Sequence, residues 1–248
     1  MAANYAELAT KATKAGLTHE AYLYEVVLSE QIQRDEHRIA RLLHRSDLPL
    51  EKTFRTLKLD RFPPVIRQQV ERLRTGAFLS DAVNIVAVGK PGVGKSHLLA
   101  ALGYELVTQG HSVHWTSTAT LVQKLLAAKR DLRLPGFIEQ LERFELLILD
   151  DIGYVQYDRD EMEVFFTLLA SRYERFSLAI STNVMFSDWE RIFKNPMTTL
   201  AAIDRVVHHS VILDLMMMDS HRAMEAQGQQ WKETAVPELP PPDDLQTE

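Results

Sequence analysis

The residues best suited to chemistry in this 248-residue sequence lie in the stretch GKPGVGKSH, which begins at Gly89. Gly89, Gly94, Lys95 and Ser96 fit the spacing G-x-x-x-x-G-K-[ST], in which glycines let backbone N–H groups surround a phosphate. We expect Lys95 to contact the β- and γ-phosphates of ATP and the Ser96 hydroxyl to bind Mg²⁺. The residues expected to bind nucleotide here are Gly89, Pro91, Gly92, Val93, Gly94, Lys95, Ser96 and His97.

Two acids end a second apolar run, LLILDD at 146–151, and an amide ends a third, AISTN at 179–183. We expect Asp150 to hold Mg²⁺ through water, and Asp151 to orient or deprotonate the water that attacks the γ-phosphate. Asn183 could hold the same water. The alternative for Asp151 is that it merely caps a turn. The alternative for Asn183 is that it is a turn-forming residue without a catalytic role. Aspartate is one methylene shorter than glutamate, so we expect slow turnover at Asp151.

Short runs rich in apolar and β-branched residues must position these groups. They alternate with longer runs in which apolar residues recur at helical spacing, which predicts a parallel sheet covered by helices on both faces. The phosphate-loop motif follows one such strand and opens a helix, and ligands of such sheets bind at the carboxyl ends of the strands. The expected strands are 82–88, 111–116, 146–150, 177–182 and 210–215.

The chain divides into three zones. Residues 1–75 are predicted to be helical, 76–233 to form the α/β ATPase domain, and 234–248, which are Pro-rich and acidic, to be disordered. Cysteine is absent, so a disulfide framework is excluded. No apolar run is long enough to predict a membrane span or a signal peptide, and we expect a cytoplasmic protein.

A basic stripe is predicted in the N-terminal zone. Residues 18–48 hold no Gly or Pro, which favours one long helix, with a single break as the alternative. Arg34, Arg38, Arg41 and Arg45 would form one line along it and could follow the phosphates of duplex DNA. The alternative is a solvated charged face, since acids flank the stripe. On the roughly opposite face we expect four residues to pack on the ATPase body or a sister helix: Leu28, Ile32, Ile39 and Leu43.

These motifs, together with SRYER at 171–175, STN at 181–183 and DRVVHH at 204–209, resemble the IstB helper ATPases of the AAA+ DnaC/IstB group. The resemblance implies an AAA+ sheet with an extra strand between the phosphate-loop strand and the LLILDD strand. It also implies ATP-dependent oligomerisation on target DNA, which is then handed to a partner transposase; such a protein would be nucleoid-associated when bound to DNA.

Two arginines gain roles only from this resemblance. Arg205, in DRVVHH, looks like the arginine finger that enters the ATP site of the next subunit; a surface salt bridge is the alternative. Arg222, in DSHR, aligns with a second phosphate sensor, but His221 stands where the family has Tyr, which puts that role in doubt. The short stretch after Arg222 implies a short or absent C-terminal lid.

Other functions use the same loop. A DnaC-type helicase loader shares much of the pattern and would need an N-terminal segment that grips a helicase. A small-molecule kinase would need a phosphoacceptor pocket and a covering lid, and the sequence indicates neither. An ATP-gated binding module with negligible turnover stays open because Asp151 is short.

Overall fold

The structure is a computed structural model that describes residues 5–153, 158–185, 189, 206–218 and 220. Arg205 and Arg222 lie outside these residues, as do the expected lid and the Pro-rich tail. Within the described part, no helix is long and apolar enough to cross a membrane.

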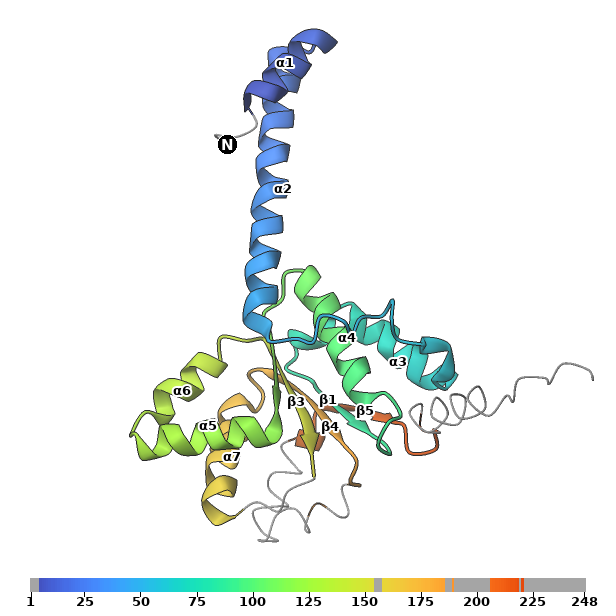
Figure 1. Ribbon diagram of the computed structural model, residues 1–248, viewed down its shortest axis with the longest axis vertical. Helices are drawn as coiled ribbons and strands as arrows, with labels where there is room; N and C mark the ends of the chain where they lie inside the picture. The colour runs from blue at the N-terminus through green and yellow to red at the C-terminus, as the bar shows by residue number, and fades with distance from the viewer. Residues whose placement is uncertain (1–4, 154–157, 186–188, 190–205, 219, 221–248) are drawn as a thin grey trace, which may run out of the picture.

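Five parallel strands form one sheet in the order β2-β3-β4-β1-β5 (Figure 1). All five expected strands are present, and β4 lies between the phosphate-loop strand β1 and the LLILDD strand β3. The extra strand implied by the AAA+ resemblance is therefore confirmed. The strands are β1 (Asn84–Val88), β2 (Val113–Ser117), β3 (Leu146–Ile152), β4 (Ser177–Thr182) and β5 (Ser210–Asp214).

Helices cover both faces of the sheet, as Figure 1 shows. Alternate residues of the central strands β1, β3 and β4 enter two cores: Ile85 and Ile148 pack on the α4 side, whereas Val86 and Leu149 pack on the side of α5, α6 and α7. This two-sided burial explains the nearly continuous apolar runs of these central strands. The covering helices are α3 (Pro64–Arg74), α4 (Lys95–Thr108), α5 (Thr118–Arg130), α6 (Leu134–Leu141) and α7 (Arg159–Arg172).

Helix α3 belongs to the α4 side of this body. Ile66, Val70 and Leu73 are buried in the same core as β1, although the expected division placed α3 in the N-terminal zone. Two short 3-10 turns, Leu59–Arg61 and Ala77–Leu79, flank it. The division into domains stays a prediction, but the helical segment that stands clear of the body ends well before residue 75.

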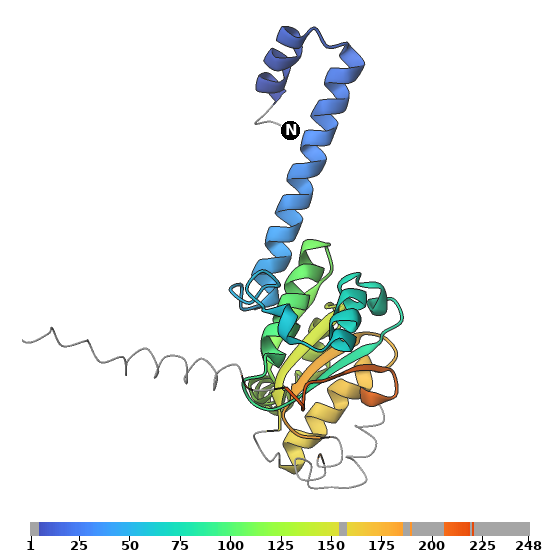
Figure 2. The same cartoon turned by 90° about the vertical axis from the view of Figure 1, so that its right-hand side faces the viewer.

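That segment is the arm, which we define as α1 (Tyr5–Ala15) and α2 (His19–Ser46). The predicted long helix is confirmed, since α2 is unbroken over 28 residues, and α1 folds back beside it (Figure 2). Thr18 caps the start of α2 by accepting a hydrogen bond from the Ala21 N–H, at 3.2 Å. In the described part of the chain, α2 contacts the body through its C-terminal third, where Arg38 bonds the Gly110 carbonyl and Leu42 and Leu43 pack against the core.

A buried arginine fixes the α7 side. Arg172 is fully buried and donates hydrogen bonds to the carbonyls of Leu141, Phe144 and Ser177, at 2.9–3.0 Å. Burial lowers the pKa of its guanidinium to about 9. By joining the ends of α6 and α7 to the start of β4, Arg172 helps to hold β4 beside β3.

Candidate functional site

The phosphate loop runs from the end of β1 into the first turn of α4. Gly94 starts the helix with φ 107° and no side-chain cap, so the first N–H groups of α4 are open to an anion. Gly92 also has a positive φ, 81°. A Cβ on Gly89 would lie 2.9 Å from the Leu215 Cβ, so only glycine allows the residue that follows β5 to lie this close. Each glycine of the motif thus has a physical reason.

Lys95 lies inside the loop. It is buried, and its Nζ donates hydrogen bonds to the carbonyls of Gly89 and Lys90, at 2.7 and 3.0 Å. Those acceptors are neutral, so a phosphate oxygen is a stronger partner for the ammonium group. The position fits the predicted phosphate contact of Lys95.

A pocket extends from this loop. The phosphate loop from Gly92 to His97 forms one wall, and the segment 52–62 forms the other. Three cationic side chains of that segment, Lys52, Lys58 and Arg61, line the pocket. His97 ties the two walls together, because its Nε2 lies 3.1 Å from the Thr56 hydroxyl and 3.3 Å from a carbonyl of the same turn. The pocket therefore pairs an anion-binding loop with further positive charge.

The acids and the amide lie at the same edge of the sheet, although they do not line that pocket. The strand end of β4 is fixed there by the Gly89 N–H, which donates to the Thr182 carbonyl at 3.1 Å. We call this edge the site edge; it holds the loop Gly89–Ser96, Asp150, Asp151 and Asn183.

A β-bulge interrupts β3 at the site edge. The β3–β4 register shifts between Leu149 and Ile152, so two residues of β3 face one residue of β4. Leu149 and Ile152 enter the same core, although residues three apart in a regular strand point to opposite faces. Asp151 is the extra residue, with φ 65°. The bulge keeps its side chain out of that core, where regular alternation would have sent it.

The surroundings of Asp151 shift the pKa of its carboxyl group. Burial and the neighbouring Asp150 carboxylate raise its pKa, and the Lys95 ammonium opposes them. A carboxylate with a raised pKa is a better proton acceptor, as a general base requires.

Asn183 offers an unused acceptor. Its Oδ1 is buried and has no hydrogen-bond partner among the residues that the structure describes. Such groups are rare unless a ligand or a water completes them. Its place just beyond β4, beside the bulge, suits the predicted contact with a water.

The groups present fit ATP and Mg²⁺. Glycines leave space for phosphates, and Lys95 supplies positive charge. Ser96 and Asp150 carry a hydroxyl and a carboxylate, the oxygen ligands that Mg²⁺ prefers. The unpartnered Asn183 oxygen adds a polar group that a bound water would satisfy.

The four arginines of α2 differ from one another. All are exposed, but Arg38 donates a hydrogen bond to the Gly110 carbonyl at 3.0 Å, and the Arg45 guanidinium lies 5.7 Å from the centre of the Phe144 ring. These two therefore help to anchor α2 to the body. Arg34 pairs with Glu30 on its own helix, and the Nε of Arg41 bonds the His37 carbonyl.

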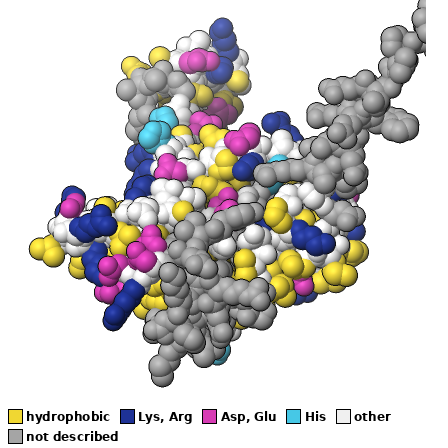
Figure 3. Space-filling model, turned by 60° about the horizontal axis from the view of Figure 1, so that its bottom comes forward, with side chains coloured by type: hydrophobic (Ala, Val, Ile, Leu, Met, Phe, Trp, Pro, Cys, Tyr) yellow, Lys and Arg dark blue, Asp and Glu magenta, His cyan; other side chains and the backbone are white. Residues whose placement is uncertain are grey.

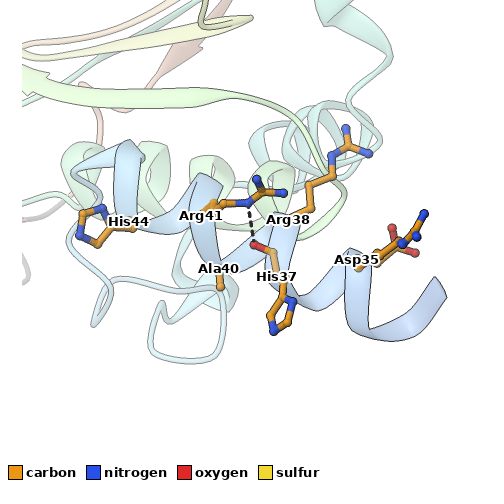
Figure 4. A pocket seen from close by; sticks show the side chains of 7 residues that line it. Asp35, His37, Arg38, Ala40, Arg41 and His44 are labelled. Atoms are coloured by element: carbon orange, nitrogen blue, oxygen red, sulfur yellow. Dashed lines mark hydrogen bonds between the residues drawn. The ribbon is translucent and has the colours of Figure 1, made fainter. Parts of the chain in front are cut away.

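Sequence reasoning missed two histidines on the same surface. His37 and His44 line a shallow hollow on α2 together with Arg34, Arg38 and Arg41 (Figure 4). Their spacing of seven places them on one helix face with Arg41 between them, a signal available in the sequence. On the face of the molecule in Figure 3, Lys and Arg side chains lie in separate groups with acidic and hydrophobic side chains between them.

Comparisons with known proteins agree with this geometry. The family described as IstB-like ATP-binding proteins matches residues 1–228. An insertion-sequence ATP-binding protein of Sinorhizobium fredii is 42% identical over 224 residues, covering 89% of this chain and 75% of its own. The ATP-binding protein of insertion sequence IS21 from Pseudomonas aeruginosa is 34% identical over 208 residues, covering 84% of this chain and 78% of its own.

Solved structures give the same fold at low identity. DnaI matches with a TM-score of 0.58 and 17% identity, covering 69% of this chain and 96% of that one. The replication initiator DnaA, solved with AMPPCP and single-stranded DNA, matches with a TM-score of 0.59 and 17% identity, covering 76% of this chain and 56% of its own. These likenesses establish the AAA+ fold.

Proposed function

Because this chain belongs to the IstB-like ATP-binding proteins, we propose that it is an ATP-dependent regulator of DNA transposition that oligomerises on duplex DNA, remodels it and recruits a partner transposase. Its curated relatives are ATP-binding proteins of insertion sequences. The observation that carries the proposal is the convergence, at one sheet edge, of a phosphate loop, two carboxylates and an unpartnered amide oxygen.

At the site edge, each residue has a distinct task. When bound, ATP supplies the scissile phosphoanhydride, and Mg²⁺ neutralises charge on its phosphate oxygens. Ser96 and Asp150 would hold the metal. Lys95 would exchange its two carbonyl partners for phosphate oxygens, Asp151 would accept a proton from the attacking water, and Asn183 would orient that water.

Completion of the site requires a second subunit in this proposal. We assign Arg205 as the arginine finger that stabilises transition-state charge in the neighbouring ATP site, a contribution of about 10³–10⁵ in rate in other systems. Arg222 stays the candidate for a second phosphate sensor.

The arm offers a surface for this self-association. On the outer half of α2, beyond the body, five large apolar side chains are 42–68% exposed. An apolar stripe of this kind on a helix marks an interaction surface. Leu28 and Ile32 belong to it, so packing on a sister helix stays the proposal for them, whereas Leu43 packs on the body of its own chain. The five are Leu23, Tyr24, Val27, Leu28 and Ile32.

The decisive experiment is electron microscopy and sedimentation of the purified protein with duplex DNA, in the presence of ATP, ADP or no nucleotide. We expect ordered particles on DNA only with ATP. Asp151→Asn should bind ATP, stall hydrolysis and accumulate these particles. Arg205→Ala should bind ATP yet lose DNA-stimulated hydrolysis, because the finger acts on the neighbour.

Several outcomes would contradict the proposal. Equal particle formation with ADP would remove the ATP dependence. Wild-type hydrolysis by Asp151→Asn would assign the water to another residue. Wild-type rates for Arg205→Ala at high dilution would exclude the trans arrangement. Association with a replicative helicase but not with DNA would favour a DnaC-type loader instead.

A further inference from the structure

The bulge at Asp150 and Asp151 faces a single residue of the neighbouring strand, Ser181. The Ser181 side chain is 1% exposed and lies on β4, at the strand end that leads to Asn183. Neither the phosphate loop nor the acids of the LLILDD run are on its strand. It therefore connects two elements of the site edge that the chain brings together only by folding.

Ser181 contacts both residues of the bulge through one oxygen atom. Its hydroxyl donates a hydrogen bond to Oδ1 of Asp150, at 2.6 Å, within the usual range for a charge-assisted bond to a carboxylate. The same Oγ accepts a hydrogen bond from the backbone N–H of Asp151, at 2.8 Å. One bond orients the carboxylate of Asp150, and the other holds the backbone of Asp151 at its positive φ of 65°.

We propose that Ser181 is a positioning residue that sets the geometry of both carboxylates across the bulge. Asp151 occupies a left-handed conformation that non-glycine residues rarely adopt, so it needs support from its surroundings. The Ser181 oxygen supplies that support at the N–H of the same residue. Among the described residues, this oxygen is the acceptor that holds the Asp151 N–H, so its loss would free the backbone of the extra residue. The inference rests on the proposed ATP hydrolysis, in which these two carboxylates act.

The test is Ser181→Ala, which removes one buried oxygen and adds no atoms. We expect kcat for ATP hydrolysis to fall about 10- to 100-fold, since the acids are deprived of two hydrogen bonds, while KM for ATP changes less than about 3-fold. The Mg²⁺ concentration at half-maximal rate should rise. In the nucleotide-free protein, amide hydrogen exchange at Asp151 should speed up about 10-fold or more, because its N–H no longer has an acceptor.

Ser177→Ala is the matched control. Ser177 lies on the same strand and is fully buried, but its hydroxyl has no hydrogen-bond partner among the described residues. This variant should leave kcat and the exchange of Asp151 unchanged. Ser181→Thr keeps the hydroxyl and should recover most of the rate, with melting curves confirming that each variant folds.

The outcomes separate this inference from the proposed function. An unchanged kcat in Ser181→Ala, or a kcat decrease of equal size in Ser177→Ala, would overturn the positioning role. Unchanged amide exchange at Asp151 would overturn it as well, and that measurement needs no nucleotide. A wild-type protein that hydrolyses no ATP would instead refute the proposed function.

Discussion

The site edge and the arm differ in how their charged side chains are held. At the site edge, β1, β3, β4 and α4 converge. Lys95 of α4 is held by a carbonyl of the phosphate loop, and Asp150 of β3 is held by a side chain of the neighbouring strand β4. On the arm, one helix presents its side chains to solvent, and Arg34 and Arg41 contact residues one turn away.

The difference predicts two kinds of mutational response. A group held by several elements in a partly dry site contributes strongly, and its replacement cannot be compensated nearby. Exposed charges on one helix act through a screened field, and their effects are smaller and roughly additive. Variants of the two regions should therefore differ in size, in salt dependence and in which ligand they affect.

The largest expected effect follows Lys95→Ala. Loss of a buried ammonium that faces phosphates should weaken ATP binding by about 100-fold or more, measured by calorimetry or by a fluorescent analogue. DNA binding without nucleotide should not change, because Lys95 lies on the body rather than on the arm. Lys129→Ala, which removes a partly exposed lysine on α5 paired with Glu163, is the control and should bind ATP normally. Retained ATP affinity in Lys95→Ala would contradict the phosphate contact of Lys95 and the expectation that variants of the site edge have the larger effects.

A smaller effect is expected from Arg34→Gln combined with Arg41→Gln. Among the described residues, the hydrogen bonds of these two side chains stay within α2. Their replacement therefore tests DNA binding without loosening the helix from the body, unlike replacement of Arg38 or Arg45. The slope of log K against log salt for duplex DNA should become shallower by about 1.8, or about 0.9 for each phosphate that is no longer neutralised.

The control for this pair has the same change in net charge at exposed positions of the body, Arg130→Gln with Arg143→Gln. It should leave the slope unchanged. If both pairs lower the slope equally, DNA binds to the general field of the protein and not to the arm.

Much of the site edge was predictable, because its motifs are local. The phosphate loop depends on glycines within eight residues, and the alternation of apolar runs with helical runs predicts a parallel sheet whose carboxyl strand ends share one edge. The neighbours of each strand followed only from the AAA+ resemblance. Sequence alone could not predict the bulge at Asp151. Regular alternation would send this side chain into the core beside α5, and the register shift becomes visible only when β4 lies alongside.

On the arm, the sequence predicts the arrangement of the arginines but not their contacts. Helical periodicity correctly predicts one line of four arginines, since they share a single helix face. It cannot distinguish Arg34 and Arg41 from Arg38 and Arg45, because the partners of the latter, Gly110 and Phe144, come from distant loops. Tertiary contacts thus divided a stripe that the sequence presents as uniform.

The smallest mutational effect is expected at the arm–body contact, where His114 of β2 meets the C-terminal end of α2. His114 of β2 lies at the C-terminal end of α2, with its Nδ1 3.4 Å from the Arg45 carbonyl and 3.7 Å from the Asp47 carboxylate, and its ring stacks on Phe144. Burial lowers the pKa of His114 below 6.5; the nearby Asp47 carboxylate opposes this shift, and Lys124 adds to it. The unfolded chain therefore binds more protons than the folded one between the two pKa values.

Stability from this histidine is consequently present above pH 6.5 and is lost as the pH falls through 6.5 toward the lower folded value. His114→Phe keeps a ring against Phe144 but cannot titrate. Between about pH 7.5 and about pH 5.5, the melting temperature of this variant should fall about 2 °C less than that of the wild type. His44→Gln, which removes an exposed histidine of the arm, is the control and should follow the wild type. If the melting temperature of His114→Phe depends on pH as that of the wild type does, His114 does not contribute to the pH dependence of stability. Other groups would then govern the acid stability of the protein.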